Sequence, residues 1–108
     1  MKDDSIYIDH ILHSINRILT YLSGKERDSF DNDFVTQDAV VRQLEIIGEA
    51  TKGVSKEFRA KHPDIPWSDM AGMRDVLIHD YIDVDLDIVW KTASEDIPLL
   101  KELLEKLQ

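Results

Sequence analysis

Apolar residues recur every three or four positions along most of this chain, which is the spacing of one buried helix face. The first stripe lies within residues 4–23 and consists of Ile8, Ile11, Leu12, Ile15, Ile18, Leu19 and Leu22. Asp3, Asp4 and Ser5 precede it as candidate N-terminal caps. Gly24 follows it, and glycine commonly ends helices. The pattern therefore predicts a helix over 4–23.

A second stripe predicts a helix that begins at Thr36 or Asp38. It consists of Val40, Val41, Leu44, Ile47 and Val54. The stretch before it, residues 25–37, is acidic and polar, and its only large apolar side chains are Phe30 and Phe34. We therefore expect a loop there, with at most one helical turn, held to the core by the two rings.

Two more helices complete the pattern. The stretch HPDIPWSDM contains two prolines and cannot be regular helix, so a third helix is predicted to begin at Ser68 or Asp69. The fourth is predicted to begin at Asp83 or Asp85, and its stripe consists of Leu86, Val89, Trp90, Ala93, Ile97, Leu100 and Leu104. Pro98 lies inside that stripe and is expected to bend the helix. No window alternates convincingly as a β-strand would.

The four stripes predict an all-α fold, an up-down bundle of four main helices with one short extra helix. The 108 residues suffice for a single domain, 1–108. A domain of this size buries about 60–68% of its unfolded surface, so pairing with a second copy would help to stabilise it. We therefore expect a homodimer.

Composition narrows the possible functions. The formal net charge is −9, which argues against a nucleic-acid binder with a broad basic surface but allows a small local group of arginines. There is no cysteine, so neither a disulfide nor a thiolate metal site can form. The N-terminal residues lack the apolar core of a signal peptide, and no apolar run is long enough for a membrane span. We expect a cytoplasmic protein with no membrane association.

A polar constellation stands out in the stretch GMRDVLIHDY, which otherwise resembles core. Arg74 and His79 are five residues apart, so an ideal helix places them about 140° apart around its axis. One chain would not easily aim both side chains at a single bond. Two copies related by a two-fold axis could combine them in one site.

The chemistry available to such a site is acid–base chemistry on a phosphodiester. Histidine titrates near neutrality and can transfer a proton, while arginine binds phosphate through a fork of donors. RNA supplies its own nucleophile in the 2′-OH, so the reaction requires neither a metal nor another cofactor. His10 and His13 on the first helix have no convincing carboxylate partner, and we expect no metal site there.

An ordinary structural interpretation exists for the same residues. Arg74 could pair with Asp75 or another acidic side chain. His79 near a helix C-terminus is favoured by the helix dipole without any function. Tyr81 could be an amphipathic core residue with a solvated hydroxyl group. Arg42 and Glu49 on the second helix could reach a cleft between two chains, but a surface ion-pair row is the favoured interpretation.

The chain as a whole resembles the HepT-like branch of the HEPN superfamily from about residue 5 to residue 105. The resemblance lies in the blocks TQDAVVRQLEIIGEATKGVS, HPDIPWSDMAGMRDVLIHDY and VDLDIVWKTASEDIPLLKELL, and in the motif R-x4-H-x-Y. It implies a dimeric helical bundle that acts as a metal-independent endoribonuclease toxin, encoded beside a nucleotidyltransferase antitoxin.

The resemblance also implies roles for individual residues. Arg74 and His79 match the catalytic arginine and histidine, and Tyr81 matches the tyrosine to which the antitoxin transfers AMP. Asp75 stands where asparagine is frequent in the superfamily. As a supporting residue it could orient Arg74 or favour the protonated form of His79, and its negative charge could also weaken the binding of RNA.

Two other classes of function stay open at this point. The chain could be a non-catalytic helical binding module that partners a nucleotidyltransferase, with Tyr81 as the modified residue. It could also be a structural helical dimer in which Arg74 and His79 only stabilise the interface.

Overall fold

A computed structural model describes residues 3–78 and 85–107, and for 74–78 it describes the backbone alone. The elements are α1 (Asp4–Leu22), α2 (Arg27–Asp31), α3 (Phe34–Gly53), α4 (Lys56–Lys61), α5 (Trp67–Ile78), α6 (Leu86–Lys91), the π-helical turn η1 (Thr92–Asp96) and α7 (Ile97–Glu105). Because α6, η1 and α7 follow one another without a break, the four predicted main helices are confirmed. The described residues contain no strand, but they contain two short extra helices, α2 and α4, instead of one.

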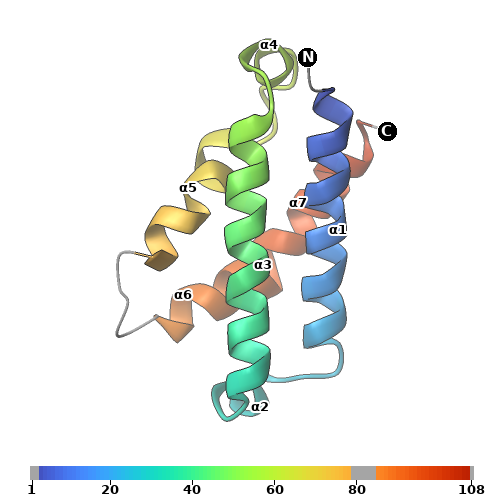
Figure 1. Ribbon diagram of the computed structural model, residues 1–108. Helices are drawn as coiled ribbons and strands as arrows, with labels where there is room; N and C mark the ends of the chain where they lie inside the picture. Colours follow the sequence, from blue (N-terminus) through green and yellow to red (C-terminus); the bar gives the residue numbers. More distant parts are fainter. Residues whose placement is uncertain (1–2, 79–84, 108) are drawn as a thin grey trace.

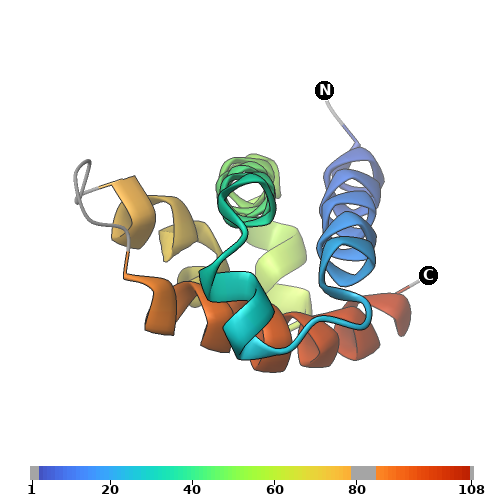
Figure 2. The same ribbon diagram turned by 90° about the horizontal axis from the view of Figure 1, so that it is seen from below.

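The main helices form two layers. α1, α3 and α5 lie side by side with α3 in the middle, and the α6–η1–α7 helix crosses one face of this layer (Figures 1 and 2). No helix of the described residues covers the opposite face of the layer (Figure 2). Within the described part of the chain, no helix is both long enough and apolar enough to cross a membrane.

The core lies where α1, α3 and the last helix meet. Its most deeply buried aliphatic residues are Ile11, Ile15, Ile18, Val40, Leu44, Ile47, Val89, Ile97 and Leu104. All of them belong to the stripes predicted from the sequence. Burying one such side chain contributes about 1.5–3 kcal/mol, so this apolar cluster is the main stabilising element of the fold.

Helix starts follow the predicted chemistry, but not always at the predicted residue. Asp3 caps α1 by accepting a hydrogen bond from the Ser5 amide at 3.0 Å. Gly24, just past the end of α1, has a φ of +73°, in the left-handed region that glycine tolerates.

The predicted cap of α3 was wrong, because α3 begins at Phe34 and its cap is Asp33 rather than Thr36 or Asp38. The Asp33 carboxylate accepts hydrogen bonds from the Thr36 hydroxyl at 2.6 Å and the Thr36 amide at 3.0 Å, and from Lys25 at 3.0 Å. These bonds, those from Thr36 first, lower the pKa of Asp33 to about 2.

The acidic stretch before α3 is attached to the core by one ring instead of two. Phe30 is fully buried and lies against Trp90, with 5.2 Å between ring centroids, whereas Phe34 is 74% exposed. The buried Gln37 amide replaces the second ring, because it donates hydrogen bonds to the carbonyl oxygens of Phe30 at 2.8 Å and Asp31 at 3.1 Å.

The distortion expected at Pro98 takes the form of a π-helical turn. Proline in a helix crowds the carbonyl group four residues earlier, here that of Ser94, and cannot donate a hydrogen bond. The wider η1 turn ends immediately before α7, which has the proline in its first turn. The apolar stripe continues through this turn, with Ala93 and Ile97 both fully buried.

Two glycines in helices have opposite surroundings, which allows a paired test. An added Cβ at Gly53 would overlap the ring of Tyr7, whereas one at Gly72 would meet nothing within 4 Å in the described structure. We expect Gly72→Ala to raise the free energy of unfolding by about 0.5–1 kcal/mol through helix propensity. Gly53→Ala should lower it by about 1–3 kcal/mol through overpacking. Urea denaturation measures both. Stabilisation by both substitutions would contradict the geometry at Gly53, and destabilisation by both would contradict that at Gly72.

The capping geometry of Asp33 predicts a pH dependence. Its pKa in the folded protein is about 2, below the ordinary value of 3.8. The ionised carboxylate therefore stabilises the fold fully when the pH is above 3.8, and this contribution is lost as the pH falls from there toward 2. The difference in free energy of unfolding between the unaltered protein and Asp33→Asn, measured by urea titration, should therefore decrease as the pH is lowered from about 5 to about 3. Asp38→Asn, which removes an exposed carboxylate of the same helix, is the matched control. If the difference in free energy of unfolding between the unaltered protein and Asp33→Asn stayed constant with pH, the proposed link between the Asp33 carboxylate and stability would be refuted.

Candidate active site

The R-x4-H-x-Y segment lies at the end of α5 and in the connection to α6. Arg74 and Asp75 belong to α5, but their side chains lie outside the described residues. His79 and Tyr81 fall within 79–84 and lie wholly outside them. The assignment of these four side chains therefore stays a prediction, and the structure defines what stands on either side of the segment.

On the upstream side, α5 is held firmly against α3. Met70 is fully buried and Trp67 is 7% exposed. The Trp67 indole N–H donates a hydrogen bond to the carbonyl oxygen of His62 at 2.9 Å, which fixes the start of α5 to the proline-containing connection before it. Arg74 follows Met70 by four residues, so this packing sets the position of its backbone one turn further along the same helix.

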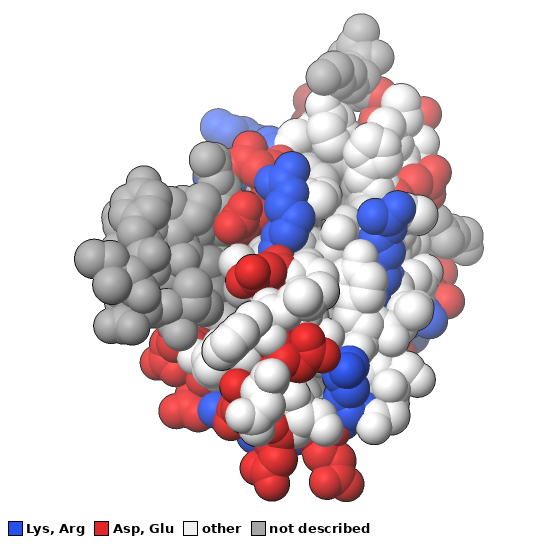
Figure 3. Space-filling model, turned by 60° about the horizontal axis from the view of Figure 1, so that its bottom comes forward, with Lys and Arg blue, Asp and Glu red and all other residues white. Residues whose placement is uncertain are grey.

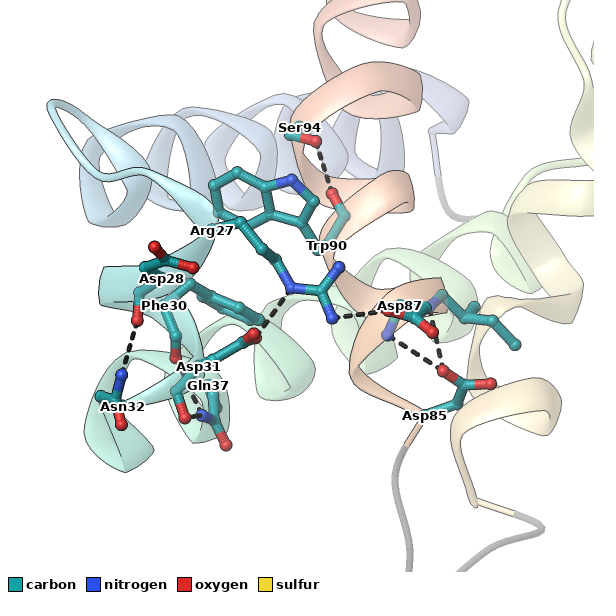
Figure 4. Close-up of polar contacts among 11 residues, drawn as sticks. Arg27, Asp28, Phe30, Asp31, Asn32, Gln37, Asp85, Asp87, Trp90 and Ser94 are labelled. Atoms are coloured by element: carbon teal, nitrogen blue, oxygen red, sulfur yellow. Dashed lines mark hydrogen bonds and ion pairs between the residues drawn. The ribbon is translucent and has the colours of Figure 1, made fainter.

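On the downstream side, α6 begins with a side-chain cap and an ion-pair cluster (Figure 4). The Asp85 carboxylate accepts hydrogen bonds from the amides of Asp87 at 2.9 Å and Ile88 at 3.4 Å. Arg27 of α2 donates from Nε to Asp31 at 2.8 Å and from Nη2 to Asp87 at 2.6 Å. These contacts, Asp31 first, raise the pKa of Arg27, so this arginine keeps its charge. The cluster joins α2 to the first turn of α6.

Aromatic packing reinforces the same junction. The rings of Phe30 and Trp90 lie 5.2 Å apart and are tilted by 47°, and the Ser94 hydroxyl donates to the carbonyl oxygen of Trp90 at 2.6 Å (Figure 4). The start of α6 therefore has both apolar and ionic attachments to α2. Both helices that flank residues 79–84 are thus anchored in the body of the fold.

The uncovered face of the three-helix layer carries charges of both signs. Arg42 lies 3.6 Å from Glu45, and Lys52 lies 4.0 Å from Glu49. These contacts support the interpretation of Arg42 and Glu49 as part of a surface ion-pair row. Figure 3 shows acidic and basic residues interspersed on the face it displays, and the described residues there form no continuous basic area.

Sequence reasoning missed a groove of about 520 Å³ between α1 and α3 on the same layer. Its described lining consists of Tyr7, His10, Arg42, Glu45, Ile46, Glu49 and Ala50. His10 was considered only as a possible metal ligand beside His13. The Nε2 atom of His13 instead accepts a hydrogen bond from Arg17 at 3.0 Å, and the described residues contain no group of three potential metal ligands.

Comparison with known proteins assigns the chain to a family. The family model described as "Ribonuclease HepT-like" matches residues 11–107. A protein of Caldanaerobacter subterraneus named "Putative RNase" is 44% identical over 98% of this chain and 98% of its own length. A Thermococcus cleftensis protein named "Probable ribonuclease HepT" is 47% identical over 94% of this chain and 93% of its own length.

A longer relative shows the same domain beside another one. The Methanocaldococcus jannaschii protein named "Gamma-glutamylcyclotransferase and putative RNase" is 48% identical over 98% of this chain, and the chain spans 48% of that protein's length. No solved structure matches this chain. The resemblance found in the sequence blocks is confirmed by the family model and by these relatives, and the chain belongs to the HepT-like ribonuclease family.

Proposed function

We propose that this member of the HepT-like ribonuclease family is the toxin component of a toxin–antitoxin pair and acts as a metal-independent endoribonuclease. The observation that carries the proposal is the match to the ribonuclease family over residues 11–107, which includes the whole R-x4-H-x-Y segment. Arg74 and His79 are the proposed catalytic residues, no cofactor takes part, and the substrate is cytoplasmic RNA.

The proposed reaction is transesterification by the RNA's own 2′-OH. His79 accepts the proton of this hydroxyl group while its oxygen forms a bond to the adjacent phosphorus. The bond from phosphorus to the 5′-oxygen breaks, and a protonated imidazole, which the partner subunit's copy of the segment can supply, donates a proton to that leaving oxygen. Arg74 stabilises the negative charge that develops on the phosphoryl oxygens. The products are a 2′,3′-cyclic phosphate end and a 5′-hydroxyl end.

A homodimer completes the proposed site. The offset of about 140° between positions 74 and 79 on a helix separates the two groups within one chain. The uncovered face of the α1–α3–α5 layer is available to a second copy, and its charges of both signs, including Arg42 and Glu45, suit a self-complementary two-fold contact (Figure 2). Asp75, beside Arg74 in sequence, is proposed to orient the guanidinium group.

The proposed regulation acts through Tyr81. A nucleotidyltransferase antitoxin would transfer AMP from ATP to the tyrosine hydroxyl with release of pyrophosphate. The product is a bulky phosphodiester two residues from His79, and its negative charge would repel an RNA phosphate at the same site.

A second candidate function is a non-catalytic binding module that partners a nucleotidyltransferase. The net charge of −9 and the absence of a continuous basic area among the described residues of Figure 3 favour it, because both disfavour tight binding of RNA. In that case Tyr81 would be modified without any nuclease to silence.

One test of the proposed function is cleavage of RNA by the purified, unmodified protein. Arg74→Ala and His79→Ala should each reduce cleavage of RNA at least about 100-fold, because each removes a group that acts in the transition state. Cleavage by the unaltered protein should persist in excess chelator and give cyclic phosphate ends, which mass spectrometry of the fragments detects. Arg17→Ala and His13→Ala are matched controls, because they remove the same residue types from the exposed face of α1 and should leave cleavage unchanged.

Two results would count against the nuclease proposal. Full activity in both Arg74→Ala and His79→Ala would remove the proposed residues from the reaction. An unaltered protein that cuts no RNA but binds a nucleotidyltransferase stably would instead support the binding module.

Another test is the modification of Tyr81 by AMP. Co-expression with a nucleotidyltransferase encoded beside this chain should add AMP-sized increments to its intact mass and reduce RNA cleavage. Tyr81→Phe should abolish the mass increments, whereas Tyr21→Phe should not. Increments that persist in Tyr81→Phe would show that another residue accepts the nucleotide.

A further inference from the structure

A second groove, separate from the one between α1 and α3, lies where α5 meets the last helix. It has a volume of about 340 Å³, and its described lining consists of Leu44, Ser68, Asp69, Gly72, Met73, Ile88, Thr92 and Asp96. Leu44, Met73 and Ile88 give it apolar walls. Gly72 adds no side chain to the groove, and a Cβ built at this position would meet no described atom within 4 Å.

The groove follows one face of the last helix. Ile88, Thr92 and Asp96 recur every four residues in its described lining, so the groove forms an elongated strip of about two helical turns, and Ile88 is 43% exposed at one end. Such a strip is longer than a compact small molecule would need, and it suits a helical segment of another protein.

The charge at the rim decides what kind of segment fits. Asp69 and Asp96 are both exposed, and the described lining contains no Lys or Arg. Neither carboxylate takes part in a hydrogen bond or an ion pair within the described part of the chain. The rim therefore offers two carboxylates that are available to cations.

Charge also separates the possible occupants. An RNA strand would bring phosphates to an acidic rim, and a second copy docked through the same groove would bring the same two carboxylates to it. A basic amphipathic helix would place its apolar face on Leu44, Met73 and Ile88 and its lysines or arginines beside the two carboxylates. We propose that this groove, between α5 and the α6–η1 segment, is a docking site for a basic amphipathic helix of a partner protein.

The experiment uses a defined probe and the full chain. A fluorescent peptide of about four helical turns, with leucines at i, i+3, i+4 and i+7 and lysines on its other face, is titrated with the protein at physiological salt while anisotropy is measured. Saturable one-to-one binding is expected. Gly72→Leu, which fills the groove, and Ile88→Ser, which removes an exposed apolar wall, should each weaken binding at least tenfold. Circular dichroism checks that both variants are folded.

The acidic rim is tested with charge-matched variants. Asp69→Asn combined with Asp96→Asn should weaken binding at least fivefold and reduce its salt dependence. Glu57→Gln combined with Glu105→Gln makes the same change in net charge at exposed positions outside the described groove lining and should leave binding unchanged. Equal weakening by both pairs would mean diffuse attraction to an acidic protein and would overturn the proposal.

Three further outcomes would also overturn it. Binding of unaltered strength in both Gly72→Leu and Ile88→Ser would place the peptide elsewhere. Displacement of the peptide by a short RNA oligonucleotide, with loss of RNA binding in the groove variants, would make the groove part of an RNA site. A change of oligomeric state in Ile88→Ser, measured by light scattering, would assign the groove to a second copy of this chain.

Discussion

The fold depends on the burial of one face of α3 between its two neighbours. Val40, Leu44 and Ile47 form the centre of that face, and each is almost completely removed from solvent. α1 packs on one side of this helix and α5 on the other, while the last helix closes the core from behind (Figure 1). The motif-bearing end of α5 therefore owes its place to apolar packing on α3. The other flank of the motif depends on a mixed junction, in which an arginine and an aromatic pair attach α6 to α2.

The sequence predicted the main helices well because a buried helix face leaves a strong periodic signal. It predicted the details less well where several residues can play the same part. Asp33, Thr36 and Asp38 are all good capping types, and only the structure shows that Asp33 accepts while Thr36 donates. α4 escaped notice because its six residues include no fully buried side chain. Its sequence signals were Ser55, whose hydroxyl group caps it through the Phe58 amide, and charges at its two ends, with Glu57 in the first turn and Arg59 and Lys61 in the last.

The functional features differ in the same way in how far the sequence can predict them. R-x4-H-x-Y is a contiguous motif, so the sequence and the family resemblance were sufficient to propose it. Neither groove could be found in this manner, because each combines side chains from distant parts of the chain. Leu44, Gly72 and Ile88, for instance, line one groove but come from three different helices. Periodicity identified Leu44 as core but could not show that it also borders a surface hollow.

The π-helical turn has a consequence for how this chain can change length. A π-turn is in effect an α-helix that has accepted one additional residue, and its surplus here lies between Leu86–Lys91 and Ile97–Glu105. Loss of one residue from 92–96 would restore an uninterrupted α-helix, and because the wider turn absorbs its surplus residue locally, the helix after it would keep its orientation relative to α6. Leu100 and Leu104 would then still face the core. Among the described main helices, this turn is therefore the position where loss of a single residue should disturb the packing least.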